Sequence, residues 1–175
     1  LSNAAQEIEL VFGEKGKPHI ANLSNVHFNI SHSGNYVVCA VSAQELGIDV
    51  ERVRKVNLRI AERFFSQPEI DDLMALEEDE RMQYFITLWT IKESYLKAIG
   101  RGLTQHLNSF TIRKNGDSYL LTGNAEAEGY GIEAFNIAPD YAMAICAPLP
   151  FSPAEVTTLT LKDITCSLPF YPESH

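Results

Sequence analysis

One stretch, Trp89-Thr90-Ile91-Lys92-Glu93-Ser94-Tyr95-Leu96-Lys97, combines a helical apolar pattern with charged side chains. It belongs to a longer run, 81–99, whose apolar residues recur at the spacing of one helix face. Gly100 and Gly102 follow the run, and glycine at this place is typical of a helix C-terminus. The run therefore predicts one long amphipathic helix against which the domain packs. Its expected buried residues are Met82, Phe85, Ile86, Trp89, Leu96 and Ile99.

A strand is predicted at Gly47-Ile48-Asp49-Val50-Glu51, an apolar run with β-branched residues. Asp49 and Glu51 stand two residues apart, so their side chains leave the same face of the strand. Glu93 and Lys97 stand four residues apart in the helix and therefore share one helix face. Three carboxylates that can converge beside a cation indicate a site for a hard metal ion and a phosphate-bearing ligand. The lack of a Cys or His cluster argues against zinc.

The other patterns place strands before and after a helical middle. Ser66 and Glu69 form a capping-box pattern with Pro68 in the first turn, so a helix is predicted from there to about residue 76. A short helix is expected at 58–65, and an acidic break or first turn at 77–80. Strands are expected at 7–12, 26–30 and 36–41, and again at 109–113, 119–121, 131–137 and 141–147. This order predicts an α+β domain.

Composition narrows the class of protein. At 175 residues and 45% hydrophobic composition, the chain can form one domain, or one and a part. Its 14 basic and 23 acidic residues give a formal charge of −9, which argues against a general nucleic-acid binder. No apolar run reaches the length of a membrane span, and no secretory signal is visible. Cys39, Cys146 and Cys166 form no Cys-x-x-Cys pair; Cys39 and Cys146 are expected as buried reduced thiols, which fits a cytoplasmic protein.

Four segments, in order across 16–102, resemble those of the phosphopantetheinyl transferases. They are Gly16-Lys17-Pro18, Phe28-Asn29-Ile30-Ser31-His32-Ser33, the strand with Asp49 and the helix with Trp89. The likeness is to the larger, surfactin-synthetase-activating (Sfp) type, and Glu69 also matches that family. Each segment alone is a weak signal, whereas four of them in this order are specific.

The resemblance implies transfer of the 4′-phosphopantetheine arm of coenzyme A to a serine of an acyl or peptidyl carrier protein, with release of 3′,5′-ADP. It implies magnesium between the pyrophosphate and the carboxylates of Asp49, Glu51 and Glu93. The residues that match coenzyme A contacts of the family are Lys17, Ser31, His32 and Lys97, and the neighbouring Pro18 and Lys92 are counted with them as candidate ligand-binding residues.

The resemblance also implies the 4′-phosphopantetheinyl transferase fold, with a long helix packed on an antiparallel sheet and the active site between two pseudo-symmetric halves. The first half is expected to be incomplete. Residues 1–45 are then its remnant, 46–150 the transferase half with the metal site, and 151–175 a tail. Residues 2–4, Ser-Asn-Ala, resemble a tag-cleavage scar. A monomer is expected if the full-length chain is present.

The catalytic roles are assigned to Asp49, Glu93 and Lys97. Glu93 is expected first as a metal ligand and second as the base that takes the serine proton. Lys97 is expected to offset charge on the transferring phosphoryl group. The alternative for Glu93 is a simple ion pair with Lys97, worth a few tenths of a kcal/mol. For His32, a phosphate contact competes with a structural hydrogen bond.

Two other functions are left open by the sequence. One is a non-catalytic module that binds coenzyme A or a carrier protein, and the other is an unrelated metal-dependent phosphotransferase or hydrolase. The Gly-Lys-Pro and Ser-His segments count against the unrelated enzyme, and the carboxylates with Lys97 count against the non-catalytic module. Because carrier proteins are usually acidic, docking needs a local basic patch or an apolar contact. The basic cluster Arg52, Arg54, Lys55 and Arg59 is either that patch or a solvated loop.

Overall fold

The computed structural model describes residues 8–13, 16–100, 105–152, 154–160 and 162–163. The strands of this part are β1 (Leu10–Phe12), β2 (Pro18–Ile20), β3 (His27–Ser33), β4 (Tyr36–Ser42), β5 (Gly47–Arg52), β6 (Thr111–Asn115), β7 (Ser118–Thr122), β8 (Tyr130–Phe135) and β9 (Tyr141–Pro148). The helices are α1 (Ala61–Phe64), α2 (Gln67–Ala75), α3 (Glu78–Ala98) and α4 (Ala125–Glu128), with short 3-10 turns at Leu58–Ile60 and Leu107–Ser109.

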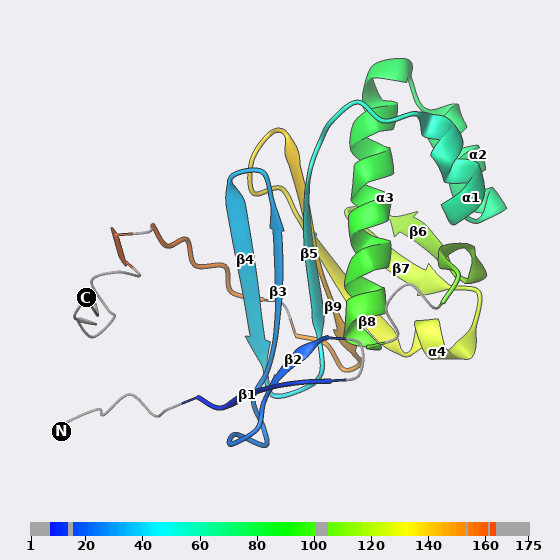
Figure 1. The fold of residues 1–175 in the computed structure, drawn as a ribbon. Helices are drawn as coiled ribbons and strands as arrows, with labels where there is room; N and C mark the ends of the chain where they lie inside the picture. Colours follow the sequence, from blue (N-terminus) through cyan, green and yellow to red (C-terminus); the bar gives the residue numbers. More distant parts are fainter. Residues whose placement is uncertain (1–7, 14–15, 101–104, 153, 161, 164–175) are drawn as a thin grey trace.

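Helix α3 lies between two layers of the domain (Figure 1). On one side it packs on the antiparallel sheet β5-β9-β8, in which β9 is the central strand. On the other side lie α1, α2 and the antiparallel β6–β7 pair. In the sheet, Asp49 is paired with Ala144 and Glu51 with Ala142, so small residues of the central strand stand beside both acidic residues. The predicted α+β class and the long helix packed on an antiparallel sheet are confirmed.

The long helix is buried on more than one side. Where the sequence pattern predicts a single apolar stripe, α3 is buried toward both layers from Phe85 onward, including Leu88, Ile91, Lys92, Tyr95 and Leu96. Of the two alternatives for 77–80, the first turn is confirmed, because the acidic segment 78–80 begins the helix, where negative charge favours the helix dipole. Gly100 follows the helix with φ +67°, as predicted, and Gly102 lies outside the described residues.

Strand β3 lies beside β5 without joining its backbone ladder. The antiparallel β3–β4 pair is a separate two-stranded sheet. Two backbone N–H groups at the free edge of β5 are satisfied by β3 side chains: Ile48 N–H donates to Asn29 Oδ1 at 2.9 Å, and Arg52 N–H donates to Ser33 Oγ at 3.0 Å. A polar seam therefore runs between β3 and β5, and α3 packs beside it.

Some predictions about single residues are confirmed, and one is wrong. The capping box at the start of α2 is confirmed, because Ser66 and Glu69 exchange both hydrogen bonds. The short helix α4 was not marked by any pattern in the sequence. The buried thiol predicted for Cys146 is confirmed, but the one predicted for Cys39 is wrong. Alternation along β4 turns Cys39 outward with Val37 and Val41, whose exposed fractions are 75% and 67%.

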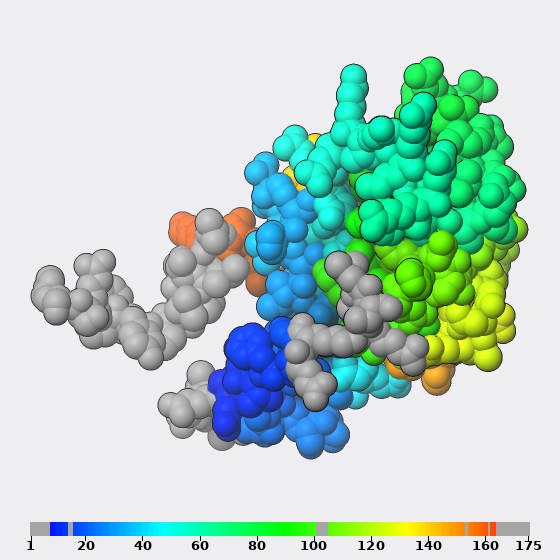
Figure 2. Space-filling model, turned by 45° about the vertical axis from the view of Figure 1, so that its right-hand side comes forward, coloured from blue at the N-terminus to red at the C-terminus, as the bar shows by residue number. Residues whose placement is uncertain are grey.

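Figure 2 shows the β1–β2 segment (blue) at the end of the molecule that carries the β3–β4 pair. In the register of this segment, Pro18 is paired with Phe12. No helix in the described ranges is long and apolar enough to cross a membrane.

Candidate active site

Asp49, Lys97 and Ser31 meet at the polar seam, each from a different element. The Lys97 ammonium, from α3, lies 2.7 Å from Asp49 Oδ1 on β5. It also donates to the Ser31 hydroxyl at 2.9 Å and to the Ile48 carbonyl at 3.1 Å. The Ser31 hydroxyl, from β3, donates to the same Asp49 oxygen at 2.8 Å. The structure thus brings together three of the residues that the sequence predicts for the site.

Alternation along the two strands explains why these side chains meet. Asn29, Ser31 and Ser33 leave one face of β3 and point toward β5, since successive side chains of a strand leave opposite faces. The Ser33 hydroxyl donates to Glu51 Oε2 at 2.9 Å, as Ser31 does to Asp49. Ser33 is a site residue that the sequence interpretation did not single out, although its two-residue spacing from Ser31 carried the signal.

Burial and neighbouring carboxylates raise the pKa of Asp49 and of Glu93. Burial raises the pKa of Asp49, and the nearby Glu51 carboxylate adds to this, whereas Lys97 and Ser31 oppose it. Burial also raises the pKa of Glu93, followed by the charge of Asp49; Lys97 opposes this, and Glu51 adds to it. Glu93 therefore lies within electrostatic reach of both other carboxylates, and together they form a region of unfavourable negative charge.

A divalent cation would fit this charge and these donors. Asp49 Oδ2 is buried and has no hydrogen-bond partner, so one strong acceptor is left unsatisfied. An all-carboxylate set suits magnesium, which takes oxygen ligands. Within the described residues, however, no three acidic, histidine or cysteine side chains are already arranged as a ligand set. The Lys97 ammonium is bonded to one Asp49 oxygen and Ser33 to one Glu51 oxygen, so assembly of the set requires side-chain rearrangement.

Lys17 lies near the end of the seam where Asn29 contacts Ile48, next to the C-terminus of α3. Its ammonium bonds Glu45 Oε2 at 2.7 Å, the Lys97 carbonyl at 3.0 Å and the Leu46 carbonyl at 3.3 Å. Lys17 and Glu45 also line an open cavity of about 500 Å³, together with His19, Gly100 and Tyr130. Pro18 begins β2 beside this cavity-lining lysine. In this arrangement Lys17 ties the start of β2 to the end of α3.

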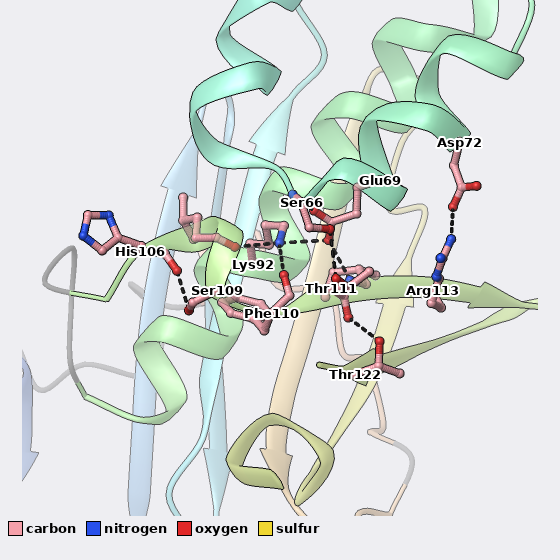
Figure 3. Close-up of polar contacts among 12 residues, drawn as sticks. Ser66, Glu69, Asp72, Lys92, His106, Ser109, Phe110, Thr111, Arg113 and Thr122 are labelled. Atoms are coloured by element: carbon pink, nitrogen blue, oxygen red, sulfur yellow. Dashed lines mark hydrogen bonds and ion pairs between the residues drawn. The ribbon is translucent and has the colours of Figure 1, made fainter. Parts of the chain in front are cut away.

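His32 and Lys92 are not brought to the carboxylates. His32 is exposed and leaves the face of β3 opposite to Ser31 and Ser33. Lys92 is completely buried and forms an ion pair with Glu69 on the far side of α3 (Figure 3). The prediction that Lys92 binds coenzyme A does not agree with this placement, because its ammonium is enclosed by protein groups and has no exposed surface.

The basic cluster at the end of β5 and after it is exposed. Arg52 forms an ion pair with Asp140 at 2.9 Å, and its guanidinium lies 5.9 Å from the centre of the Tyr141 ring. Arg54, Lys55 and Arg59 are also exposed. These cations thus lie at the surface, next to the end of the acidic strand. This placement is compatible with a docking patch and with a solvated loop.

The comparisons with known proteins agree with this fold. Residues 45–146 match the 4′-phosphopantetheinyl transferase superfamily. The chain is 40% identical over 153 residues to the 4′-phosphopantetheinyl transferase Sfp of Bacillus subtilis, covering 86% of this chain and 68% of that protein. It is 37% identical over 155 residues to the 4′-phosphopantetheinyl transferase psf-1 of Bacillus pumilus, covering 87% and 66%. The chain thus spans about two thirds of the length of these relatives.

A solved structure supports the fold independently. The Thermotoga maritima holo-[acyl-carrier-protein] synthase (AcpS) superposes with a TM-score of 0.50 at 20% sequence identity, covering 58% of this chain and 61% of that one. In this fold a long helix and an acidic strand lie side by side and contribute residues to the same seam. The chain belongs to the 4′-phosphopantetheinyl transferase superfamily, and its relatives place it with the Sfp-type transferases.

Proposed function

We propose that this protein transfers the 4′-phosphopantetheine arm of coenzyme A to a serine of an acyl or peptidyl carrier protein and releases 3′,5′-ADP. The observation that carries the proposal is the meeting of Asp49 and Lys97 at the seam, with Glu51 and Glu93 within electrostatic reach. The similarity to relatives named 4′-phosphopantetheinyl transferase supports the same reaction.

Magnesium is proposed to bind to the carboxylates of Asp49, Glu51 and Glu93. When bound, this ion supplies positive charge that neutralises the pyrophosphate of coenzyme A. Ser31 and Ser33 orient Asp49 and Glu51 by the hydrogen bonds described above. Lys97 donates to the phosphate oxygen on which negative charge grows during transfer.

The proton of the carrier serine needs an acceptor at the same site. We assign Glu93 first as a ligand and second as this base. The two roles compete, because a bound cation lowers the basicity of a carboxylate. The serine oxygen forms a bond to the phosphorus that bears the pantetheine arm. The bond from that phosphorus to the bridging oxygen breaks, and 3′,5′-ADP leaves with the electron pair.

The carrier protein is proposed to dock beside the acidic strand. In a chain of charge −9, the exposed cations Arg52, Arg54, Lys55 and Arg59 offer a local positive surface for an acidic partner. Reversal of charge at Arg54 and Lys55 together should slow transfer at low salt and have less effect at high salt, since salt screens such contacts.

Calorimetry tests the metal and ligand assignment. Because a pyrophosphate beside three carboxylates is repelled until a divalent ion bridges them, coenzyme A should bind in magnesium and bind weakly in a chelator. Equal coenzyme A affinity in magnesium and in the chelator would contradict the magnesium assignment. A mass gain on an apo-carrier protein then separates the transferase from the non-catalytic binding module, which would bind coenzyme A and transfer nothing.

A further inference from the structure

Glu69 and Lys92 form a completely enclosed ion pair between α2 and α3 (Figure 3). The Lys92 ammonium lies 2.8 Å from Glu69 Oε1, and neither side chain has any exposed surface. Both charges are therefore shielded from water. Burial lowers the pKa of Lys92, whereas the Glu69 carboxylate acts to raise it. Such a pair is costly to desolvate and calls for a specific set of partners.

Those partners come from two segments of the chain, the start of α2 and residues 107–112. Glu69 Oε1 also accepts the Ile112 N–H of β6 at 2.6 Å, and Oε2 accepts the Ser66 N–H at the start of α2 at 2.7 Å. The Lys92 ammonium donates to the Leu107 carbonyl at 2.7 Å and to the Phe110 carbonyl at 2.9 Å. It also lies 4.2 Å from the centre of the Phe110 ring. The pair thus joins α2, α3, the 3-10 turn and β6.

The pair also faces away from the seam. Successive residues of an α-helix are about 100° apart around its axis, so Lys92 and its neighbour Glu93 leave different sides of α3. Lys97 follows Glu93 by one turn and bonds Asp49 on the seam side. Helix α3 is therefore fastened by a polar contact on each side, and a rotation or slide of α3 would move Glu93 and Lys97 relative to Asp49.

Stability alone does not explain this arrangement. Replacing a buried ion pair by apolar residues of similar volume is often neutral or stabilising, whereas a fixed polar geometry specifies how two elements meet. We infer that Glu69 and Lys92 are positioning residues, which hold α3 at the rotation and height that present Glu93 and Lys97 to Asp49. This inference rests on the proposed transferase function of the seam.

The test uses the full chain with the neutral pair Glu69→Gln/Lys92→Met. Gln retains a carbonyl oxygen for the Ile112 N–H, and Met fills the volume of the lysine stem. A matched control is Asp72→Asn/Arg113→Gln, which removes an exposed ion pair of 3.0 Å between α2 and β6, two of the elements that contact the buried pair. Both proteins are assayed well below their melting midpoints, with the folded fraction measured by circular dichroism.

The neutral pair should lower transfer per folded molecule by about 10-fold to 100-fold, the scale of a small misplacement of catalytic groups. It should also weaken magnesium-supported coenzyme A binding in calorimetry, while the control pair behaves as the wild type in both measurements. A lowered melting temperature with wild-type transfer per folded molecule and wild-type coenzyme A affinity would overturn the positioning role.

The two proposals fail in different ways. If the wild-type chain binds coenzyme A but transfers nothing to a carrier protein, the proposed function fails, and coenzyme A affinity still tests the positioning role. If the neutral pair does not fold, Lys92→Arg provides the second variant, because it keeps the positive charge but alters its length and shape. Wild-type transfer and affinity in folded Lys92→Arg would contradict a role that depends on geometry.

Discussion

The Lys97 ammonium lies 2.7 Å from Asp49 Oδ1, so a side chain of α3 is the counter-ion of the buried acidic residue on β5. The other Asp49 oxygen is buried without a hydrogen-bond partner. Lys97 therefore stands where positive charge is needed and competes with a divalent ion for the same carboxylate. Its two roles, as counter-ion to Asp49 and as donor to a ligand phosphate, make opposite predictions for metal and for coenzyme A.

Lys97→Met should strengthen binding of magnesium alone and weaken binding of coenzyme A. The substitution removes a competing cation from Asp49, so the free metal meets less repulsion. It also removes a charged donor to the phosphate, a loss of about 1.5–3 kcal/mol in coenzyme A binding. Calorimetry with magnesium, and then with coenzyme A in excess magnesium, measures both. Lys114→Met, an exposed lysine of β6, is the control; a fall in both affinities for Lys97→Met would contradict the competition.

Gly47→Ala should destabilise the domain by about 1–3 kcal/mol, the usual cost of overpacking. A Cβ at Gly47 would fall on the Ser94 carbonyl oxygen and the Ala98 backbone nitrogen of α3, and backbone cannot move aside as a flexible side chain can. The glycine thus permits the close approach of β5 and α3 that lets Lys97 reach Asp49. Thermal melting measures the effect. Gly13→Ala is the control, since its new methyl would meet the movable His19 side chain at 3.3 Å and the Lys17 carbonyl oxygen at an ordinary contact distance of 3.6 Å.

Much of this framework could be predicted because it depends on local patterns. The periodicity of 81–99 predicted α3, and the Ser66 capping box predicted the start of α2. The two-residue spacing of Asp49 and Glu51 predicted their shared face. These features depend on residues a few positions apart, which is the range over which helix and strand geometry acts.

The seam and the buried ion pair could not be predicted in the same way. Ser31 and Asp49 meet because β3 lies beside β5, a contact between strands that share no backbone ladder. Helix pitch alone gives Lys92 and Glu93 different sides of α3. It did not predict the partner on that side, because Glu69 belongs to another helix and the partner carbonyls belong to the turn before β6.

Metal-free Glu93→Gln should melt at a higher temperature than the wild type at neutral pH. The folded protein raises the pKa of Glu93, so the folded state binds a proton more tightly than the unfolded state. The associated stability is present below the ordinary glutamate pKa and is lost as pH rises through the raised value. Melting in a chelator across pH should show the gain at neutral pH and its disappearance in acid. A variant less stable than the wild type at neutral pH would indicate a net favourable pairing of Glu93 with Lys97.

Glu93→Gln should nevertheless slow transfer to an apo-carrier protein by about 100-fold or more, the scale of a lost general base. Gln keeps the shape and helix propensity of Glu, so a large effect reports chemistry. Transfer is followed as the mass gain on the carrier, with Glu80→Gln, an exposed acidic residue of the same helix, as control. Higher magnesium should restore part of the rate if Glu93 acts mainly as a ligand, and none if it acts as the base. A wild-type rate at every magnesium concentration would show that Glu93 is neither a ligand nor the base, because both roles need its negative charge. Glu93 would then be only a helix-surface partner of Lys97.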